Sequence, residues 1–258
     1  MRKSAFLVFF VFIFVLSACA KKQAVKPEPP FIAEASFAKA NSLFEHGHYH
    51  KARKIFEQVK AKDASGAFSP LAMLRIADTY RKDGEPDSAV NEYKEFLKIH
   101  PDQEYAPYAQ YHIAMIRFGQ IEGYDRDGGA PRKALREFEK LEYLYPRNPY
   151  ESSVRLCMAR CKDIMARHEF MVGHFYYRKK AWRGALGRFE GILAKYPGFS
   201  RIPEVLYMAA VSAQALGDRQ KAGVYLGRLQ GQYPYSLYTA KARKDKKLDA
   251  LLSGLPRS

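Results

Sequence analysis

The sequence predicts an all-α protein, a solenoid of about five helix–turn–helix repeats, and two recurring spacings support this prediction. Five alanines, each followed four residues later by an apolar side chain, recur along the chain: Ala52, Ala89, Ala134, Ala185 and Ala222. A proline stands twelve residues after each of the last four, at Pro101, Pro146, Pro197 and Pro234. Small residues let two helices approach closely and proline ends a helix, so each unit is expected to be a pair of packed helices. No segment has the pattern of a strand ladder.

The spacing resembles the tetratricopeptide repeat, a helix–turn–helix unit of about 34 residues. We place five repeats, with ten main helices, at 33–66, 70–103, 107–148, 166–199 and 203–236. Two irregularities are expected, because successive alanines are 37, 45, 51 and 37 residues apart. One is an insertion around 123–129, and the other is a long first helix in repeat four, from near Tyr150 to about Lys179. The basic segment 240–252 is expected to form a C-terminal capping helix.

The N-terminal segment predicts export and lipidation. Arg2 and Lys3 precede twelve apolar residues, 5–16, and then Leu-Ser-Ala-Cys19. Such a run of helix spans about 18 Å, short of the ~30 Å hydrocarbon core, so residues 1–18 are interpreted as a signal peptide. The last four residues resemble the bacterial lipobox, which implies that Cys19 carries diacylglycerol and a fatty acid. The alternative is an ordinary signal peptide with an incidental cysteine.

The resemblance to a lipobox also implies a location. Ala20 follows the cysteine where an aspartate commonly retains lipoproteins in the inner membrane. We therefore expect a protein anchored by its lipid to the outer membrane of a Gram-negative bacterium, facing the periplasm. Residues 19–32, with Pro27, Pro29 and Pro30, are expected to be a semi-rigid tether.

Composition and motifs narrow the function class. Of 258 residues, 47% are hydrophobic, which excludes global disorder, and Lys plus Arg outnumber Asp plus Glu by 43 to 27. Catalytic motifs are absent, so we expect no enzyme and no cofactor beyond the lipid on Cys19. The exported chain has no nucleic-acid recognition motif, which leaves anionic lipid or an acidic protein surface as partners for its charge.

Three groups of residues could suggest a metal site or a disulfide, and the sequence argues against each of them. The histidines 46, 48 and 50 straddle a repeat turn without acid or thiolate neighbours, so no metal is expected there. A calcium loop starting at Asp125 lacks the required residues at positions six and twelve, which are Ala130 and Arg136. Cys157 and Cys161 lie one helical turn apart, where a disulfide is disfavoured, so they are interpreted as small packing residues.

First helices of such repeats line a groove, and the helical phase predicts which side chains face it. The predicted substrate-peptide groove comprises Phe37, Asn41, Phe44, Leu74, Arg75, Tyr108, Tyr111, His112 and Phe118, and the same phase turns Asp78 toward it. Aromatic rings beside cations suit an extended, partly apolar peptide with a carboxylate. The alternative is that these rings pack between helices. The two-lysine clamp of some repeat domains is not intact, because Asn41 matches it but Phe37 and Tyr108 replace its lysines.

The second half carries a more specific resemblance. Its sequence motifs are Tyr124–Asp127, Glu169–Val172, Phe175–Tyr177, Ala181-Trp182, Arg188–Gly191 and Tyr196-Pro197. With the lipobox and the repeats, they resemble the BamD family, lipoproteins of the outer-membrane β-barrel assembly complex. The resemblance implies that residues 33–148 bind unfolded outer-membrane proteins. It also implies that residues 149–236 dock to the POTRA-bearing β-barrel subunit, with other assembly lipoproteins nearby, and that 237–258 form a basic cap and tail.

Docking is expected at Tyr177, Trp182, Arg188 and Glu190. The Arg188 side chain leaves the core beside the inward Phe189, and the alternative is a solvated arginine with a local carboxylate. A different function is also open, a periplasmic repeat lipoprotein that coordinates cell-wall synthesis with envelope constriction. A lytic enzyme built on a helical superhelix is not expected, because it would need a catalytic glutamate in a separate compact domain and the repeats leave no residues to build one.

Overall fold

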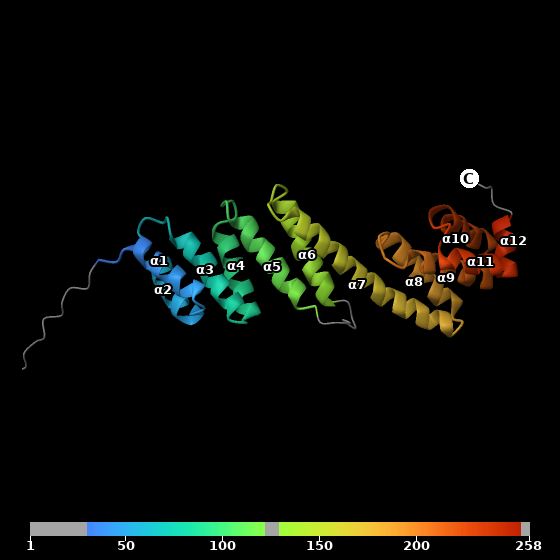
Figure 1. Cartoon of the computed structure of the whole chain (residues 1–258), viewed down its shortest axis with the longest axis horizontal. Coiled ribbons are helices and arrows are strands. Elements are labelled where there is room, and N and C mark those ends of the chain that lie inside the picture. Colours follow the sequence, from blue (N-terminus) through green and yellow to red (C-terminus); the bar gives the residue numbers. More distant parts are fainter. Residues whose placement is uncertain (1–29, 122–128, 254–258) are drawn as a thin grey trace, which may run out of the picture. The chain divides into compact units, whose positions relative to one another are not determined.

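The computed structural model describes residues 30–121 and 129–253, and within them every regular element is an α-helix (Figure 1). The ten main helices form five consecutive pairs: α1 Ala33–Glu45 and α2 Tyr49–Lys62, α3 Ser69–Lys82 and α4 Pro86–Ile99, α5 Ala106–Gly119 and α6 Gly129–Leu144, α7 Glu151–Arg178 and α8 Trp182–Lys195, α9 Ile202–Ala215 and α10 Arg219–Gln232. Each packs mainly against the helices before and after it in the chain. The predicted all-α repeat solenoid is confirmed.

The long helix predicted for repeat four and the predicted C-terminal cap can be compared with the structure, whereas nearly all of the predicted insertion around 123–129 lies outside the described residues. The long helix of repeat four is present as α7, which has 28 residues. The C-terminal cap differs from the expected single helix, because it consists of α11 Leu237–Lys244 and α12 Lys246–Ser253. Asp245 breaks the helix with an extended backbone, and its carboxylate accepts hydrogen bonds from the Lys247 and Leu248 amides at 2.9 and 3.3 Å. An aspartate that caps a new N-terminus favours two short helices over one.

Several predicted features lie outside the described residues. These are the signal peptide, Cys19, nearly all of the tether and the Asp125–Asp127 loop. Within the described residues, no helix has both the length and the apolar character needed to cross a membrane.

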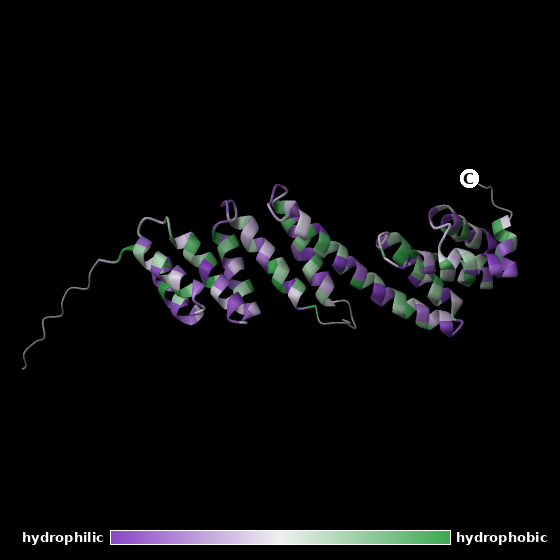
Figure 2. Ribbon diagram, viewed as in Figure 1, coloured by the Kyte–Doolittle hydropathy of each residue, from purple (hydrophilic) through white to green (hydrophobic). Residues whose placement is uncertain are grey.

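The recurring alanines stand where the paired helices touch. All five of them are fully buried, and so are the apolar residues four positions later, such as Phe56, Phe138 and Phe189. Gly173 takes the small-residue position in α7, where an added Cβ would lie 2.9 Å from the Phe189 ring of α8. Since each helix buries one face and exposes another, hydrophobic and hydrophilic residues are mixed along the helices, as Figure 2 shows.

Backbone conformation at the turns follows the repeat. Gly47, Gly84 and Gly217 have φ of 78°, 80° and 85°, which a residue without Cβ adopts at little cost. In repeat four the corresponding turn residue is Lys180, with φ of 58°. The turn therefore keeps its left-handed conformation even where glycine is absent.

The core consists of apolar clusters that follow one another along the chain. Helix α7 joins two of them, because its N-terminal half contributes Val154 and Met158 to a cluster with α5 and α6. Its C-terminal half contributes Ala166 and Phe170 to a cluster that extends to α12. Because α7 is long, α6 packs with its N-terminal half and α8 packs with its C-terminal half.

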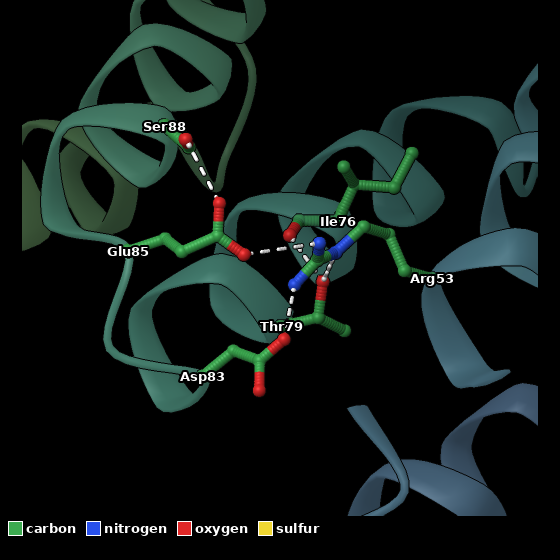
Figure 3. A network of polar contacts seen from close by, with 6 residues as sticks. All are labelled: Arg53, Ile76, Thr79, Asp83, Glu85 and Ser88. Atoms are coloured by element: carbon green, nitrogen blue, oxygen red, sulfur yellow. Dashed lines mark hydrogen bonds and ion pairs between the residues drawn. The ribbon is translucent and has the colours of Figure 1, made fainter. Parts of the chain in front are cut away.

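A polar network fastens the first repeat to the second (Figure 3). Arg53 of α2 is buried, and its guanidinium reaches the turn between α3 and α4. It donates to the Thr79 hydroxyl at 3.0 Å and pairs with the Asp83 carboxylate at 2.9 Å. The guanidinium carbon lies 3.6 Å from the centre of the Tyr80 ring. Charge-assisted bonds and cation–π stacking thus join consecutive repeats.

Candidate functional site

The first helices of repeats one to three, α1, α3 and α5, surround a cavity of about 330 Å³. Its lining residues are Phe37, Leu71, Leu74, Arg75, Asp78, Tyr105 and Tyr108. Five of the residues that the helical phase placed in the groove are among them: Phe37, Leu74, Arg75, Asp78 and Tyr108. Sequence reasoning missed Leu71, which lies one turn before Arg75, and Tyr105, which precedes α5.

A buried carboxylate forms the polar part of this cavity. Asp78 is 2% exposed and accepts hydrogen bonds from the hydroxyls of Tyr93, at 2.5 Å, and Tyr108, at 2.8 Å. Burial and the Asp78 charge raise the pKa of both phenols, so they remain donors at neutral pH. Arg81 and Arg75 lie 3.3 and 3.6 Å from the same carboxylate. Two cations therefore offset one buried anion beside an apolar wall.

Three other predicted groove rings pack against neighbouring helices. Tyr111 stacks on Tyr150 of the turn before α7, with ring centroids 4.0 Å apart. Phe118 meets Phe138 of α6 edge to face. Phe44, in repeat one, is buried with 8% of its surface exposed to solvent, and the Arg75 guanidinium carbon lies 5.3 Å from the centre of its ring. Helix packing thus accounts for these rings, because none of them lines the cavity.

The last two predicted groove residues, His112 and Asn41, neither line the cavity nor belong to the three packed rings. His112 stacks on Tyr93 and meets Tyr108 edge to face at 4.3 Å, and burial lowers the pKa of its imidazole to about 4. Its ring is therefore neutral at pH 7 and supports the tyrosines that hold Asp78. Asn41 is partly buried, and its Oδ1 has no hydrogen-bond partner among the described residues.

A second concavity, of about 320 Å³, lies between α7 and α8. Its lining residues are Glu169, Arg183, Gly184, Gly187, Arg188, Gly191, Lys195 and Tyr196. Gly187 and Gly191 have open space where a Cβ would project, so the backbone of α8 is accessible there. Three cations against one acid make the surroundings positive.

Arg188 is the one predicted docking residue in this concavity. Its guanidinium pairs with the Glu169 carboxylate of α7 at 2.7 Å, with side chains 45% and 33% exposed. The local carboxylate that sequence reasoning gave as the alternative is therefore present. Pairs this exposed contribute about 0–1 kcal/mol, so the bond is exchangeable.

The other three predicted docking residues line no part of this concavity. The Tyr177 ring packs against the core cluster and makes an edge-to-face contact with Trp182. Burial raises the pKa of its phenol to about 12. Glu190 accepts from the Tyr225 hydroxyl at 2.7 Å and pairs with Lys221 at 3.0 Å, which joins α8 to α10. Their role in docking stays a prediction.

Other chemistry-bearing groups are sparse. Within residues 30–121 and 129–253, no three His, Cys, Asp or Glu side chains are grouped to hold a metal. Cys157 and Cys161 are free thiols, and burial raises the pKa of Cys161 to about 12. A thiol with so high a pKa is protonated and unreactive at neutral pH.

Fold and surfaces together define a tetratricopeptide-repeat solenoid with a cavity among the first helices of repeats one to three. The chain is similar in fold to the TPR2AB domain of yeast Sti1, solved in complex with pHSP90. The TM-score is 0.50 at 13% identity, covering 86% of this chain and 84% of that one.

Sequence comparison identifies the family. The YfiO family, described as outer membrane lipoprotein, matches residues 32–223, and this chain belongs to it. Similar proteins include the outer membrane protein assembly factor BamD of Neisseria meningitidis serogroup A, 24% identical over 88% of this chain and 90% of the relative. The factor of the same name in Vibrio cholerae is 22% identical over 79% of this chain and 88% of the relative. The predicted resemblance to the BamD family is confirmed.

Proposed function

We propose that this protein is a scaffold of outer-membrane β-barrel assembly, which binds unfolded outer-membrane protein segments and docks to the POTRA-bearing subunit. The observation that carries the proposal is the cavity of α1, α3 and α5 in a chain of the YfiO family. Relatives named as outer membrane protein assembly factors support the same role. Acylation of Cys19 would hold the scaffold at the membrane where its substrates insert.

The groove has the chemistry for an unfolded β-strand segment. Such a segment alternates apolar and polar side chains, and its chain terminus adds a carboxylate. Phe37, Leu71, Leu74 and Tyr105 offer apolar and aromatic contacts. The Arg75 side chain is 35% exposed and offers a cation to a terminal carboxylate. We expect the terminal aromatic of an outer-membrane strand to enter this cavity.

Crosslinking tests this placement. A peptide of an outer-membrane C-terminal strand, with a photoreactive terminal residue, should label α1, α3 or α5 of the purified protein. Leu71→Asp places a carboxylate in the cavity wall at a partly buried position and should reduce labelling at least tenfold, because an unpaired charge there repels an apolar side chain. The matched control is Leu156→Asp, since Leu156 of α7 is 74% exposed and outside the cavity. Labelling confined to residues beyond 200 would contradict the placement.

The α7–α8 concavity has the chemistry for the docking partner. A carboxylate on the partner would compete with Glu169 for Arg188, and the bare glycines of α8 would admit a closely packed backbone. Truncating a buried arginine of an interfacial pair costs roughly 2–5 kcal/mol. Arg188→Ala should therefore weaken binding to the isolated POTRA region at least tenfold while the thermal melting profile stays near wild type. Equal affinity of the variant and the wild type would remove Arg188 from the site.

Copurification distinguishes the assembly role from the cell-wall alternative. The lipid-anchored protein is recovered from detergent-solubilised outer membranes. A β-barrel protein with periplasmic POTRA domains among its partners supports the assembly role. Recovery of cell-wall synthases in its place supports the alternative.

A further inference from the structure

The two helices that close the array carry a positive charge that lies outside both of the cavities described above. Five basic side chains of α11 and α12 are exposed: Lys241, Arg243, Lys244, Lys246 and Lys247. Only two acids, Asp245 and Asp249, lie in the same helices and the turn between them. Among the described residues, none of the five cations has a carboxylate within ion-pair distance.

Helix geometry gathers part of this charge on one face with an apolar tip. Leu237, Lys241 and Lys244 follow the i, i+4, i+7 spacing of one face of α11. The opposite face packs inward through the buried Thr239 and Ala242. Leu237 is 64% exposed, and Tyr235, two residues before it, is 99% exposed. An exposed tyrosine and an exposed leucine thus precede Lys241 and Lys244 in α11, one of the two helices at the C-terminal end of the described chain (Figure 1).

One of the two acids in this region, Asp245, caps a helix. One Asp245 carboxylate oxygen accepts the Lys247 and Leu248 amides that begin α12. The Lys241 ammonium lies 5.0 Å from the centre of the Tyr238 ring, a contact that leaves its charge uncompensated. The cations are therefore available to an anionic partner.

We propose that this cap, residues 235–253, binds the surface of an anionic phospholipid bilayer. Tyrosine and leucine favour the interface between head groups and acyl chains, while lysine extends its ammonium to the phosphates. A bilayer offers many phosphates and an apolar layer together, which matches cations spread over two helices beside an apolar tip. Membership of a family of outer membrane lipoproteins places a membrane within reach of this surface. The contact would be additional to the lipid on Cys19.

Vesicle binding of residues 20–258, which lack the acylated cysteine, tests the proposal. The helical body within 32–258 is a compact unit with its own apolar cores, so this chain retains the cap. Co-sedimentation is measured with vesicles of phosphatidylcholine and with an equimolar mixture of phosphatidylcholine and phosphatidylglycerol. We expect binding to the anionic vesicles alone, weakened by salt because exposed charges are screened.

Three variants separate the cap from the overall charge. Each cap cation near an anionic surface strengthens binding about fivefold, so K241Q/K244Q/K246Q should weaken it about a hundredfold. K39Q/K51Q/K54Q removes three exposed lysines from α1 and α2 and should bind within a few-fold of wild type. Y235S/L237S keeps the charge and should weaken binding about tenfold through the lost apolar contact.

Equal losses in the two lysine variants would reduce the effect to net charge and overturn the proposal. So would wild-type binding to neither vesicle. In that case, crosslinking of Lys241 to an acidic protein in native membranes would assign the cap to a protein partner instead. Helix content by circular dichroism should be unchanged in all variants, because every altered side chain is exposed.

Discussion

Arg53 is the residue on which the attachment of the first repeat is expected to depend. Its side chain is 9% exposed and binds three groups of repeat two, at Thr79, Asp83 and Glu85. The guanidinium also stacks on Tyr80. We therefore predict that Arg53→Met, which keeps an apolar stem but removes the charge, loosens α1 and α2 from the rest of the array.

The size of the effect follows from the exposure of the partners. A hydrogen bond to a charged group contributes about 1.5–3 kcal/mol, and a cation–π contact about 0.5–2 kcal/mol. Asp83 and Glu85 are 39% and 47% exposed, so water solvates their carboxylates again once the arginine is gone. The loss should thus fall below the ~3–5 kcal/mol of a fully buried broken pair, at about 2–3 kcal/mol.

Urea unfolding followed by circular dichroism measures the free energy of unfolding, and hydrogen exchange locates the change. Repeats interact with nearest neighbours, so amides of α1 and α2 should lose protection while those of α9 and α10 keep it. Arg117→Met is the matched control. Arg117 also pairs across helices, with Asp87 at 2.9 Å, but that carboxylate is 76% exposed. Its loss should cost under ~1 kcal/mol.

Equal destabilisation by the two variants would refute the reasoning, because burial would then not decide the strength of the pair. Unchanged protection of α1 and α2 in Arg53→Met would refute it as well, even if the whole chain were less stable.

Three further predictions follow from other positions. Gly173→Ala should lower the free energy of unfolding by about 1–3 kcal/mol, because its Cβ would meet the Phe189 ring at 2.9 Å. Gly187→Ala, whose Cβ would project into open space, should leave the stability unchanged or raise it. Thermal melting of both variants measures this difference, and equal effects would contradict the prediction. Unfolding free energy should fall by about 1–2 kcal/mol between pH 7 and pH 5, because the unfolded chain protonates His112 near its ordinary pKa of 6.5 and the folded chain only near 4. This contribution should disappear in His112→Gln, and an identical slope in the variant would assign it to other groups. Cys19→Ala should abolish palmitate labelling and release the protein from the outer membrane; retained labelling would disprove lipidation at Cys19.

Local spacing was enough to predict much of the fold. The alanine and proline periods located all five helix pairs, since close helix contacts admit only small side chains. The same reasoning anticipated the long α7, because a gap of 51 residues between Ala134 and Ala185 exceeds one repeat. It predicted one capping helix where Asp245 divides two. The capping carboxylate of Asp245, which accepts hydrogen bonds from the Lys247 and Leu248 amides, favours the division.

The site was less accessible to sequence reasoning. Helical phase gave five of the cavity residues but did not separate Tyr108, which lines the cavity, from Tyr111, which stacks on Tyr150. The two tyrosines are three positions apart on α5, so both lie toward the same side of the helix. What each ring touches depends on the neighbouring repeats.

The sequence by itself determined the class of fold, the succession of helix pairs and the family, because these depend on spacing and residue type within a short stretch; the lipid anchor at Cys19 stays a prediction. Only the tertiary structure decided which aromatics form a cavity and which form the core. It alone brought Arg53 to the turn between α3 and α4, and it paired Arg188 with Glu169, 19 residues away. Such contacts depend on how consecutive helices cross. That geometry arises from many side chains packing at once, and no single period in the sequence encodes it.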